Sequence, residues 1–315
     1  MNLILHIGIS KTGTTSLQKW LSVHFQDAHS GVFYPGSVDL PGTIEGNHRG
    51  LVMFSGAELA WSEQLGRNIR NQLPKALRDL SKEEFQERFM IALRQSIKTG
   101  KESGAKYMVL SNEHLSERPT NNDLDFFSDS LDGLFETRKI VLYLREQCAA
   151  YQSLYGETLK HGSVKTFQNF IHDDSVVRLF DYHGLIERWR ERGWEVEPRI
   201  YHERGGNSGK WKLIEDFAHN VLPKSSKDNQ FDTEKRANLS LSSNMFSLKR
   251  LINQTHLNRV IPLHRQRRAL SFLSRLRRKD AFRLAQGEQF KWIFARHEAG
   301  NAQVARHFFN RENLF

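Results

Sequence analysis

Cysteine and long apolar runs are scarce in this sequence. Cys148 is the only cysteine among 315 residues, which excludes an internal disulfide and any metal site built from several cysteines. A reducing compartment suits such a chain. No apolar run approaches the roughly 18 to 20 residues that a membrane-spanning helix needs. The first apolar run, Leu3 to Ile7, is too short for the core of a signal peptide and lacks a basic flank, so we interpret it as a strand and expect a cytoplasmic protein.

Acidic residues are outnumbered by basic ones. The 36 Asp and Glu residues stand against 46 Lys and Arg residues, which gives a formal net charge of +10 and a pI near 9.7. A positive field of this kind attracts anions, so nucleotides, nucleic acid, acidic glycans and anionic membranes are all open as partners. The length suits one main domain, because α/β enzymes often reach it around a single sheet.

Short apolar runs alternate with stretches of helical spacing over most of the chain. The first run ends at Gly8, and Leu17, Leu21 and Phe25 then follow one helical face. Further strands are expected at residues 107–110, 139–144 and 196–201. Helices are expected within 56–102, where Ser81 is a candidate N-cap, and over 145–160, 179–192 and 211–221. The pattern predicts an α/β fold, with a parallel central sheet flanked by helices on both faces.

The C-terminal part has only helical spacing. Helices are expected at about residues 240–254, 263–284 and 297–309. The polar stretch 225–236 is the best candidate for a boundary within the fold. We therefore expect a single domain over residues 1–315, made of an α/β core (1–225) and a mainly helical C-terminal extension (236–315) packed on it.

The segment after the first strand has the skeleton of a phosphate-binding loop. Four residues separate Gly8 from Gly13, and Thr14 and Thr15 begin the helix that follows. Backbone N–H groups and a helix N-terminus would then point at an anion. Loops that bind ATP or GTP carry Lys directly after the second Gly, whereas here that position is Thr14 and the lysine is Lys11, inside the loop.

This arrangement closely resembles the 5′-phosphosulfate-binding loop of sulfotransferases that use 3′-phosphoadenosine 5′-phosphosulfate (PAPS), especially the K-T-G-T-T form found in carbohydrate sulfotransferases. The resemblance implies a sulfotransferase architecture related to the P-loop fold, and PAPS as the sulfuryl donor. It also implies that one continuous segment holds the donor: Ser10, Lys11, Thr12, Gly13, Thr14 and Thr15. A divergent nucleotide kinase, or a simple strand-to-helix turn, is the alternative interpretation of the loop.

A second match follows the expected strand at 139–144. Sulfotransferases hold the 3′-phosphate of the donor with an Arg at a strand end and a Ser eight residues later, and Arg145 and Ser153 have this spacing. A guanidinium forms paired bonds to phosphate, and a hydroxyl early in a helix can reach the same anion. Many family members have Pro two residues after the Arg, where this chain has Gln147. Taken alone, a strand-end Arg is more often a surface ion pair.

The implied reaction needs a base for the acceptor hydroxyl and positive charge near the leaving phosphate, and it needs no metal. Lys11 is the candidate for the charge. Residues 31–50, rich in Gly and Pro, are expected to form a mobile or ligand-facing loop, and by the resemblance this loop carries two candidate bases, Glu45 and His48. An ordinary histidine pKa of about 6.5 favours His48. Glu113 and His114 follow the second core strand, at the edge where open α/β sheets bind ligands, and the choice among the four stays open.

The acceptor is expected to be a hydroxyl of a glycan or glycolipid, because the loop resembles that of carbohydrate-modifying members. Residues 259–283 contain nine Lys and Arg against one acid, interleaved with leucines. This segment is either a basic amphipathic helix that contacts an anionic membrane surface, which would place the protein at the inner membrane face, or an ordinary solvated helix. Two other functions remain open: a nucleotide or sugar kinase that uses ATP and Mg²⁺, and a non-catalytic protein that binds nucleic acid or another polyanion. No nucleic-acid module is recognisable, so nucleic acid is not expected as a partner.

Overall fold

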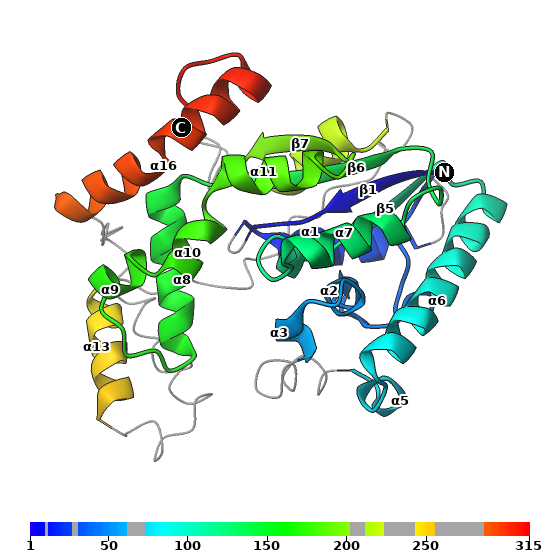
Figure 1. The fold of residues 1–315 in the computed structure, drawn as a ribbon, viewed down its shortest axis with the longest axis horizontal. Coiled ribbons are helices and arrows are strands. Elements are labelled where there is room, and N and C mark those ends of the chain that lie inside the picture. Colours follow the sequence, from blue (N-terminus) through cyan, green and yellow to red (C-terminus); the bar gives the residue numbers. More distant parts are fainter. Residues whose placement is uncertain (10–11, 27–30, 62–72, 202–211, 224–242, 256–286) are drawn as a thin grey trace. The chain divides into compact units, whose positions relative to one another are not determined.

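The structure is a computed structural model that describes residues 1–9, 12–26, 31–61, 73–201, 212–223, 243–255 and 287–315. It has the α/β fold that the sequence predicts, with a five-stranded parallel sheet flanked by helices. The strands lie in the order β2 (Val32–Phe33), β5 (Tyr107–Ser111), β1 (Asn2–His6), β6 (Arg138–Leu144) and β7 (Glu195–Ile200) (Figure 1). A separate two-stranded hairpin pairs β3 (Thr43–Ile44) with β4 (Asn47–His48).

The chain divides into two compact units, residues 1–144 with 184–234 and residues 145–183 with 235–315. The first unit contains the sheet, and its described helical segments are α1 (Thr14–His24), α2 (Gly50–Phe54), α3 (Glu58–Trp61), α5 (Lys75–Arg78), α6 (Lys82–Glu102), η1 (Glu113–Leu115), α7 (Asn121–Ser130), α12 (Lys212–Asp216) and the π-helical turn η3 (Phe217–Val221). Helix α11 (Tyr182–Arg190) begins in the second unit and continues into the first.

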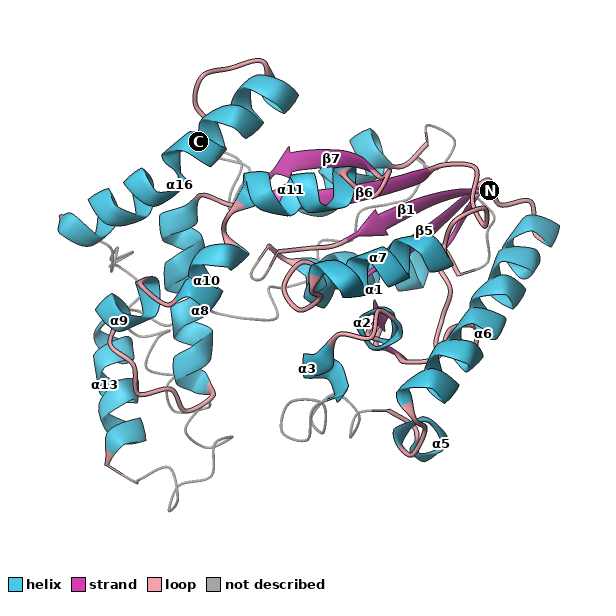
Figure 2. Cartoon of the chain, viewed as in Figure 1, coloured by secondary structure: helices cyan, strands magenta, loops and turns pink. Residues whose placement is uncertain are grey.

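In the second unit the described segments are helical (Figure 2): α8 (Gln147–Lys160), α9 (Phe167–Ile171), α10 (Asp174–Leu179), α13 (Ser243–Gln254) and α16 (Glu288–Phe309). Both α13 and α16 contact α8. Residues 145–183, which the sequence places in the α/β core, therefore group with the C-terminal helices. The single domain stays a prediction.

The strands β5, β1 and β6 at the centre of the sheet are buried on both faces, as their apolar sequences require in a parallel sheet. Along β1, Leu3 and Leu5 are fully buried on one face, while Ile4 on the other face is 4% exposed. The Ile4 face packs against Leu17 and Leu21 of α1 and Phe217 of η3. This packing holds the start of α1 at the carboxyl end of β1.

Several boundaries differ from the sequence prediction. The segment 31–50 is not only a loop, because it contains β2 and the β3–β4 hairpin. The helix expected over 179–192 is wrong at its start, since α10 ends at Leu179 and α11 begins at Tyr182. The last helix begins at Glu288, nine residues before the predicted 297. The helix expected at 263–284 lies outside the described residues, as does the whole of the basic segment 259–283. The candidate N-cap at Ser81 is confirmed, with a complete capping box to Glu84.

None of the described helices is both long enough and apolar enough to cross a membrane.

Candidate functional site

The predicted phosphate-binding loop joins β1 to α1. Gly13 is the N-cap residue of α1 and has a left-handed backbone conformation (φ 82°). Because glycine has no side chain, no side-chain hydrogen bond caps the helix. The first turn of α1 contains no acidic residue, so its N–H groups and positive dipole are not neutralised from within the helix. Ser10 and Lys11 lie outside the described residues.

The described part of the loop is folded tightly on itself. The Thr12 hydroxyl donates to the carbonyl oxygen of Ile9 at 2.7 Å, and Thr12 as a whole residue is 1% exposed. A Cβ atom on Gly8 would lie 2.5 Å from Oγ1 of Thr14 and 3.1 Å from Cε1 of His6. Gly8 is therefore needed because the chain passes between two side chains with no room for a third.

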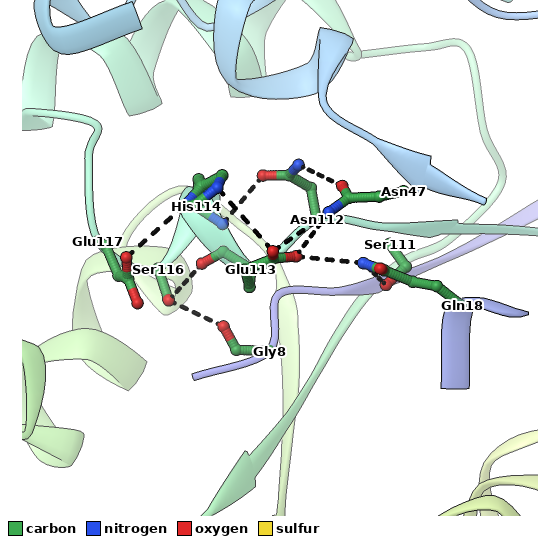
Figure 3. A network of polar contacts seen from close by, with 9 residues as sticks. All are labelled: Gly8, Gln18, Asn47, Ser111, Asn112, Glu113, His114, Ser116 and Glu117. Carbon is green, nitrogen blue, oxygen red and sulfur yellow. Dashed lines mark hydrogen bonds and ion pairs between the residues drawn. The ribbon is translucent and has the colours of Figure 1, made fainter. Parts of the chain in front are cut away.

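The segment after β5 is tied to this loop. The hydroxyl of Ser116 lies 2.9 Å from the carbonyl oxygen of Gly8 and 2.7 Å from that of Glu113 (Figure 3). Asn112 caps the short helix η1 by accepting the N–H of His114 at 3.0 Å. Because β5 and β1 are parallel neighbours, their carboxyl ends meet at one edge of the sheet. Glu113 thus follows its strand at the edge where the sequence places it.

Two amide side chains hold the carboxylate of Glu113. The Nε2 atom of Gln18 donates to it at 3.2 Å, and the Nδ2 atom of Asn47 lies 3.1 and 3.0 Å from its two oxygens (Figure 3). The oxygen of the Asn47 amide accepts in turn from Asn112 at 2.9 Å. The Glu113 side chain is 21% exposed. The two amide groups fix the carboxylate in place, and its exposed part can be reached by a bound molecule.

His48 has a different environment. It is fully buried, its Nε2 lies 2.8 Å from the carbonyl oxygen of Pro35, and its Nδ1 accepts the backbone N–H of Ser111 at 2.9 Å. Nδ1 accepts, so the ring proton is on Nε2 and is donated to Pro35. Burial lowers the pKa of His48 to about 4. Both nitrogens serve backbone groups, so this geometry weighs against His48 as the base, a role that the sequence alone favoured.

The other two candidate bases are placed differently. Glu45 is exposed and has a left-handed backbone at φ 48°, in the turn between β3 and β4. His114 lies between two carboxylates, with Nε2 3.9 Å from Glu113 and Nδ1 3.7 Å from Glu117. His114 is thus beside Glu113, and Glu45 is on a solvent-facing turn.

Gln18 and Asn47 were not identified from the sequence as site residues. Gln18 lies on α1 and is 2% exposed, and Asn47 lies on β4 and is 7% exposed. A buried amide side chain needs hydrogen-bond partners. The only sequence signal for such a residue was the position of Gln18, directly after Leu17 in the helix. The partners themselves are 95 and 66 residues away in sequence, at Glu113.

The second motif lies in the other unit, at the start of α8. Arg145 directly follows β6, and its carbonyl accepts the hydroxyl of Tyr182 at 2.5 Å. Ser153 is on α8, as the sequence predicts, and is partly exposed. The carboxylate of Glu146 accepts the N–H groups of Cys148 and Ala149, both at 2.9 Å. These first-turn amides already have an anionic partner, so a phosphate at this place would rely on side chains.

Comparisons with protein-family models, curated proteins and solved structures found no match to this chain. In the described residues, no group of three or more His, Cys, Asp or Glu side chains gathers in a way that could hold a metal ion.

Proposed function

We propose that this chain is a PAPS-dependent sulfotransferase that transfers a sulfuryl group to a hydroxyl of a glycan or glycolipid. One observation carries the proposal: a glycine-containing loop that ends on a helix N-terminus without a side-chain cap is hydrogen-bonded, through Ser116, to the segment that presents the carboxylate of Glu113. An anion site and a proton acceptor at one sheet edge are what transfer from an anionic donor to a hydroxyl requires.

The donor would be held mainly by backbone groups of the loop. The N–H groups of Thr14 and Thr15 begin α1 and have no acceptor within the helix, so they can meet the 5′-phosphosulfate. The Thr12 hydroxyl is engaged by Ile9, so Thr12 shapes the loop. Ser10 and Lys11 complete the loop in the proposal, and Lys11 supplies positive charge near the leaving phosphate. Arg145 and Ser153 are assigned to the 3′-phosphate on the strength of the sequence resemblance.

Glu113 is the proposed general base. Its carboxylate takes the proton of the acceptor hydroxyl as the hydroxyl oxygen forms a bond to sulfur and the bond between sulfur and the phosphate oxygen breaks. The products are a sulfate ester and 3′-phosphoadenosine 5′-phosphate (PAP), and no metal ion takes part. Glu113 is preferred to His48 because its carboxylate is partly exposed, whereas both nitrogens of His48 are bonded to backbone groups.

The acceptor and the location are inferred from the sequence. A glycan or glycolipid acceptor follows from the carbohydrate-sulfotransferase form of the loop, and the charge of +10 suits anionic products. The cytoplasm is the proposed compartment, with peripheral contact between residues 259–283 and an anionic membrane surface.

Substitution of Glu113 tests the proposal. With radiolabelled PAPS and a panel of bacterial glycans, E113Q should lower turnover by a factor of roughly 10² to 10⁴, the usual contribution of a general base. Its affinity for PAP should stay within about threefold of the unsubstituted protein, because base and donor sites are separate. E117Q is the matched control, since Glu117 is a carboxylate four residues away that lies 3.7 Å from His114. Full turnover in E113Q would remove Glu113 from this role.

A further inference from the structure

His6 is a buried polar residue between the loop and Glu113 that the proposed reaction does not use. It is the last residue of β1 and is 1% exposed. Its ring lies edge-on to Tyr143 and Phe217, with centroids 6.0 and 6.1 Å apart. Burial lowers the pKa of His6 to about 4, a shift that the charge of Glu113 partly opposes. The imidazole is therefore neutral at physiological pH.

One ring nitrogen of His6 begins a chain of contacts to Glu113. Nδ1 of His6 lies 2.8 Å from the hydroxyl oxygen of Ser111, which is its partner across the β1–β5 register. The same hydroxyl oxygen accepts from Nε2 of Gln18 at 3.2 Å, and that Nε2 also donates to Glu113 at 3.2 Å (Figure 3). An amide NH₂ has two hydrogens, so Gln18 serves both acceptors. The Ser111 hydroxyl can then donate its own hydrogen to Nδ1.

The Cε1 atom of the ring, which lies between the two nitrogens, faces the loop. Cε1 of His6 lies 3.1 Å from the position that a Cβ of Gly8 would take, beside the side chain of Thr14. Nε2, the atom bonded to Cε1, is buried and has no hydrogen-bond partner among the described residues. An unpaired buried nitrogen is costly and uncommon in a structural histidine. Its place next to the first glycine of the loop therefore needs a functional reason.

We infer that His6 is a positioning residue, which fixes the carboxylate of Glu113 relative to the anion-binding loop through Ser111 and Gln18. The inference rests on the proposed function. Cε1 of His6 lies 3.1 Å from the place that a Gly8 Cβ would take, and Nδ1 reaches Glu113 through the side chains of Ser111 and Gln18.

Two substitutions of His6 test the inference in the full-length protein. H6F keeps a ring of similar shape but removes both nitrogens, and it should lower kcat by roughly 10- to 100-fold, as expected when a catalytic group is misplaced by a fraction of an ångström. KM for PAPS and the Kd for PAP should change by less than about threefold, because the loop amides remain. H6N places an amide where Nδ1 stood and should recover most of kcat. Unchanged kcat in H6F, or failure of H6N to rescue it, would overturn the inference.

S111A supplies the matched test of the path. If His6 acts through Ser111, S111A should lower kcat to a similar extent, and the double variant H6F/S111A should be no slower than the slower single variant. Effects that multiply in the double variant would show two independent roles and would contradict the inference. Circular dichroism and thermal unfolding identify any variant that fails to fold, and H6N and S111A then carry the test.

A spectroscopic reading separates this inference from the proposed function. In protein labelled with ¹⁵N at histidine, E113Q should shift the ring-nitrogen resonances of His6 at pH 7, and E117Q should not. A chain that transfers no sulfuryl group but shows this shift would refute the sulfotransferase proposal and retain the link between His6 and Glu113. If the ring-nitrogen resonances of His6 do not shift in E113Q, the link between His6 and Glu113 is refuted, whatever reaction the protein catalyses.

Discussion

Replacement of Gly8 by Ala tests how tightly the loop is packed against the sheet. The added Cβ would lie 2.5 Å from Oγ1 of Thr14, a distance that real Cβ contacts do not show, and 3.1 Å from Cε1 of His6. Thr14 is 7% exposed and His6 is 1% exposed, so neither side chain can swing into solvent. The loop itself must move in G8A, away from β1 and away from the start of α1.

The expected cost follows from these two contacts. Forcing one extra methyl group into a packed site usually costs about 1 to 3 kcal/mol, and we expect G8A in the upper half of that range because the closest contact is below 3.0 Å. T14A removes both Oγ1 and Cγ2, the two Thr14 atoms nearest to the new Cβ. The double variant G8A/T14A should therefore be more stable than the sum of the single effects by about 1 kcal/mol or more.

Urea unfolding followed by tryptophan fluorescence measures these free energies. G300A is the matched glycine control, since its Cβ would meet nothing closer than 3.4 Å on α16, where Ala should be neutral or stabilising by about 0.5 to 1 kcal/mol. PAP affinity should fall in G8A and be unchanged in G300A. If G8A is as stable as the unsubstituted protein, or if its effect adds to that of T14A, the loop is not packed between Thr14 and His6.

Three further predictions concern the buried histidines and one ion pair. H48F leaves the N–H of Ser111 and the carbonyl of Pro35 without the hydrogen bonds to His48. It should therefore lower the free energy of unfolding by about 2 to 4 kcal/mol, while kcat per folded molecule stays near normal. A stable H48F variant that has lost turnover would restore His48 as the base. Folding lowers the pKa of both His6 and His48 from 6.5 to about 4, so the unfolded chain binds protons that the folded chain excludes. The free energy of unfolding should therefore fall between about pH 6.5 and pH 4, by at most about 1.4 kcal/mol per pH unit for each histidine; urea midpoints at pH 7.5 and 5.5 measure the slope, and a flat profile is incompatible with two neutral buried rings. R199K should lower the stability measured by thermal unfolding by about 1 kcal/mol, because Lys cannot reproduce the paired bonds of Arg199 to Asp216 at 2.5 and 2.6 Å. K98Q is the control: it removes the exposed ion pair of Lys98 with Glu102 at 3.9 Å and should leave the stability unchanged.

Strands β1, β5 and β6 were predictable because each is a mainly apolar run buried on both faces, whereas β7 alternates buried residues with charged ones. The segments predicted at residues 3–7, 107–110, 139–144 and 196–201 became β1, β5, β6 and β7 with shifts of at most one residue at each end. Strand β2 and the β3–β4 hairpin were missed. Each of these strands has two residues, which is too few for a period to repeat, and their Gly- and Pro-rich surroundings indicate a loop.

Only those features of the site that follow from the order of the strands were predictable from the sequence. The carboxyl ends of neighbouring parallel strands meet, so the sequence could place Glu113 beside the loop that starts at Gly8. It could not show that Gln18 and Asn47 hold the carboxylate, because those contacts depend on how α1 and β4 pack on the sheet. His48 was favoured from its ordinary pKa, a property that burial and two backbone partners reverse.

Calorimetric titration with PAP, with and without Mg²⁺, tests the central claim most directly. The account predicts tight binding of PAP that does not depend on Mg²⁺, and much weaker binding of ATP under the same conditions. ATP that binds as tightly as PAP, and only when Mg²⁺ is present, would contradict the account and assign the Gly8 to Thr15 loop to a nucleotide or sugar kinase.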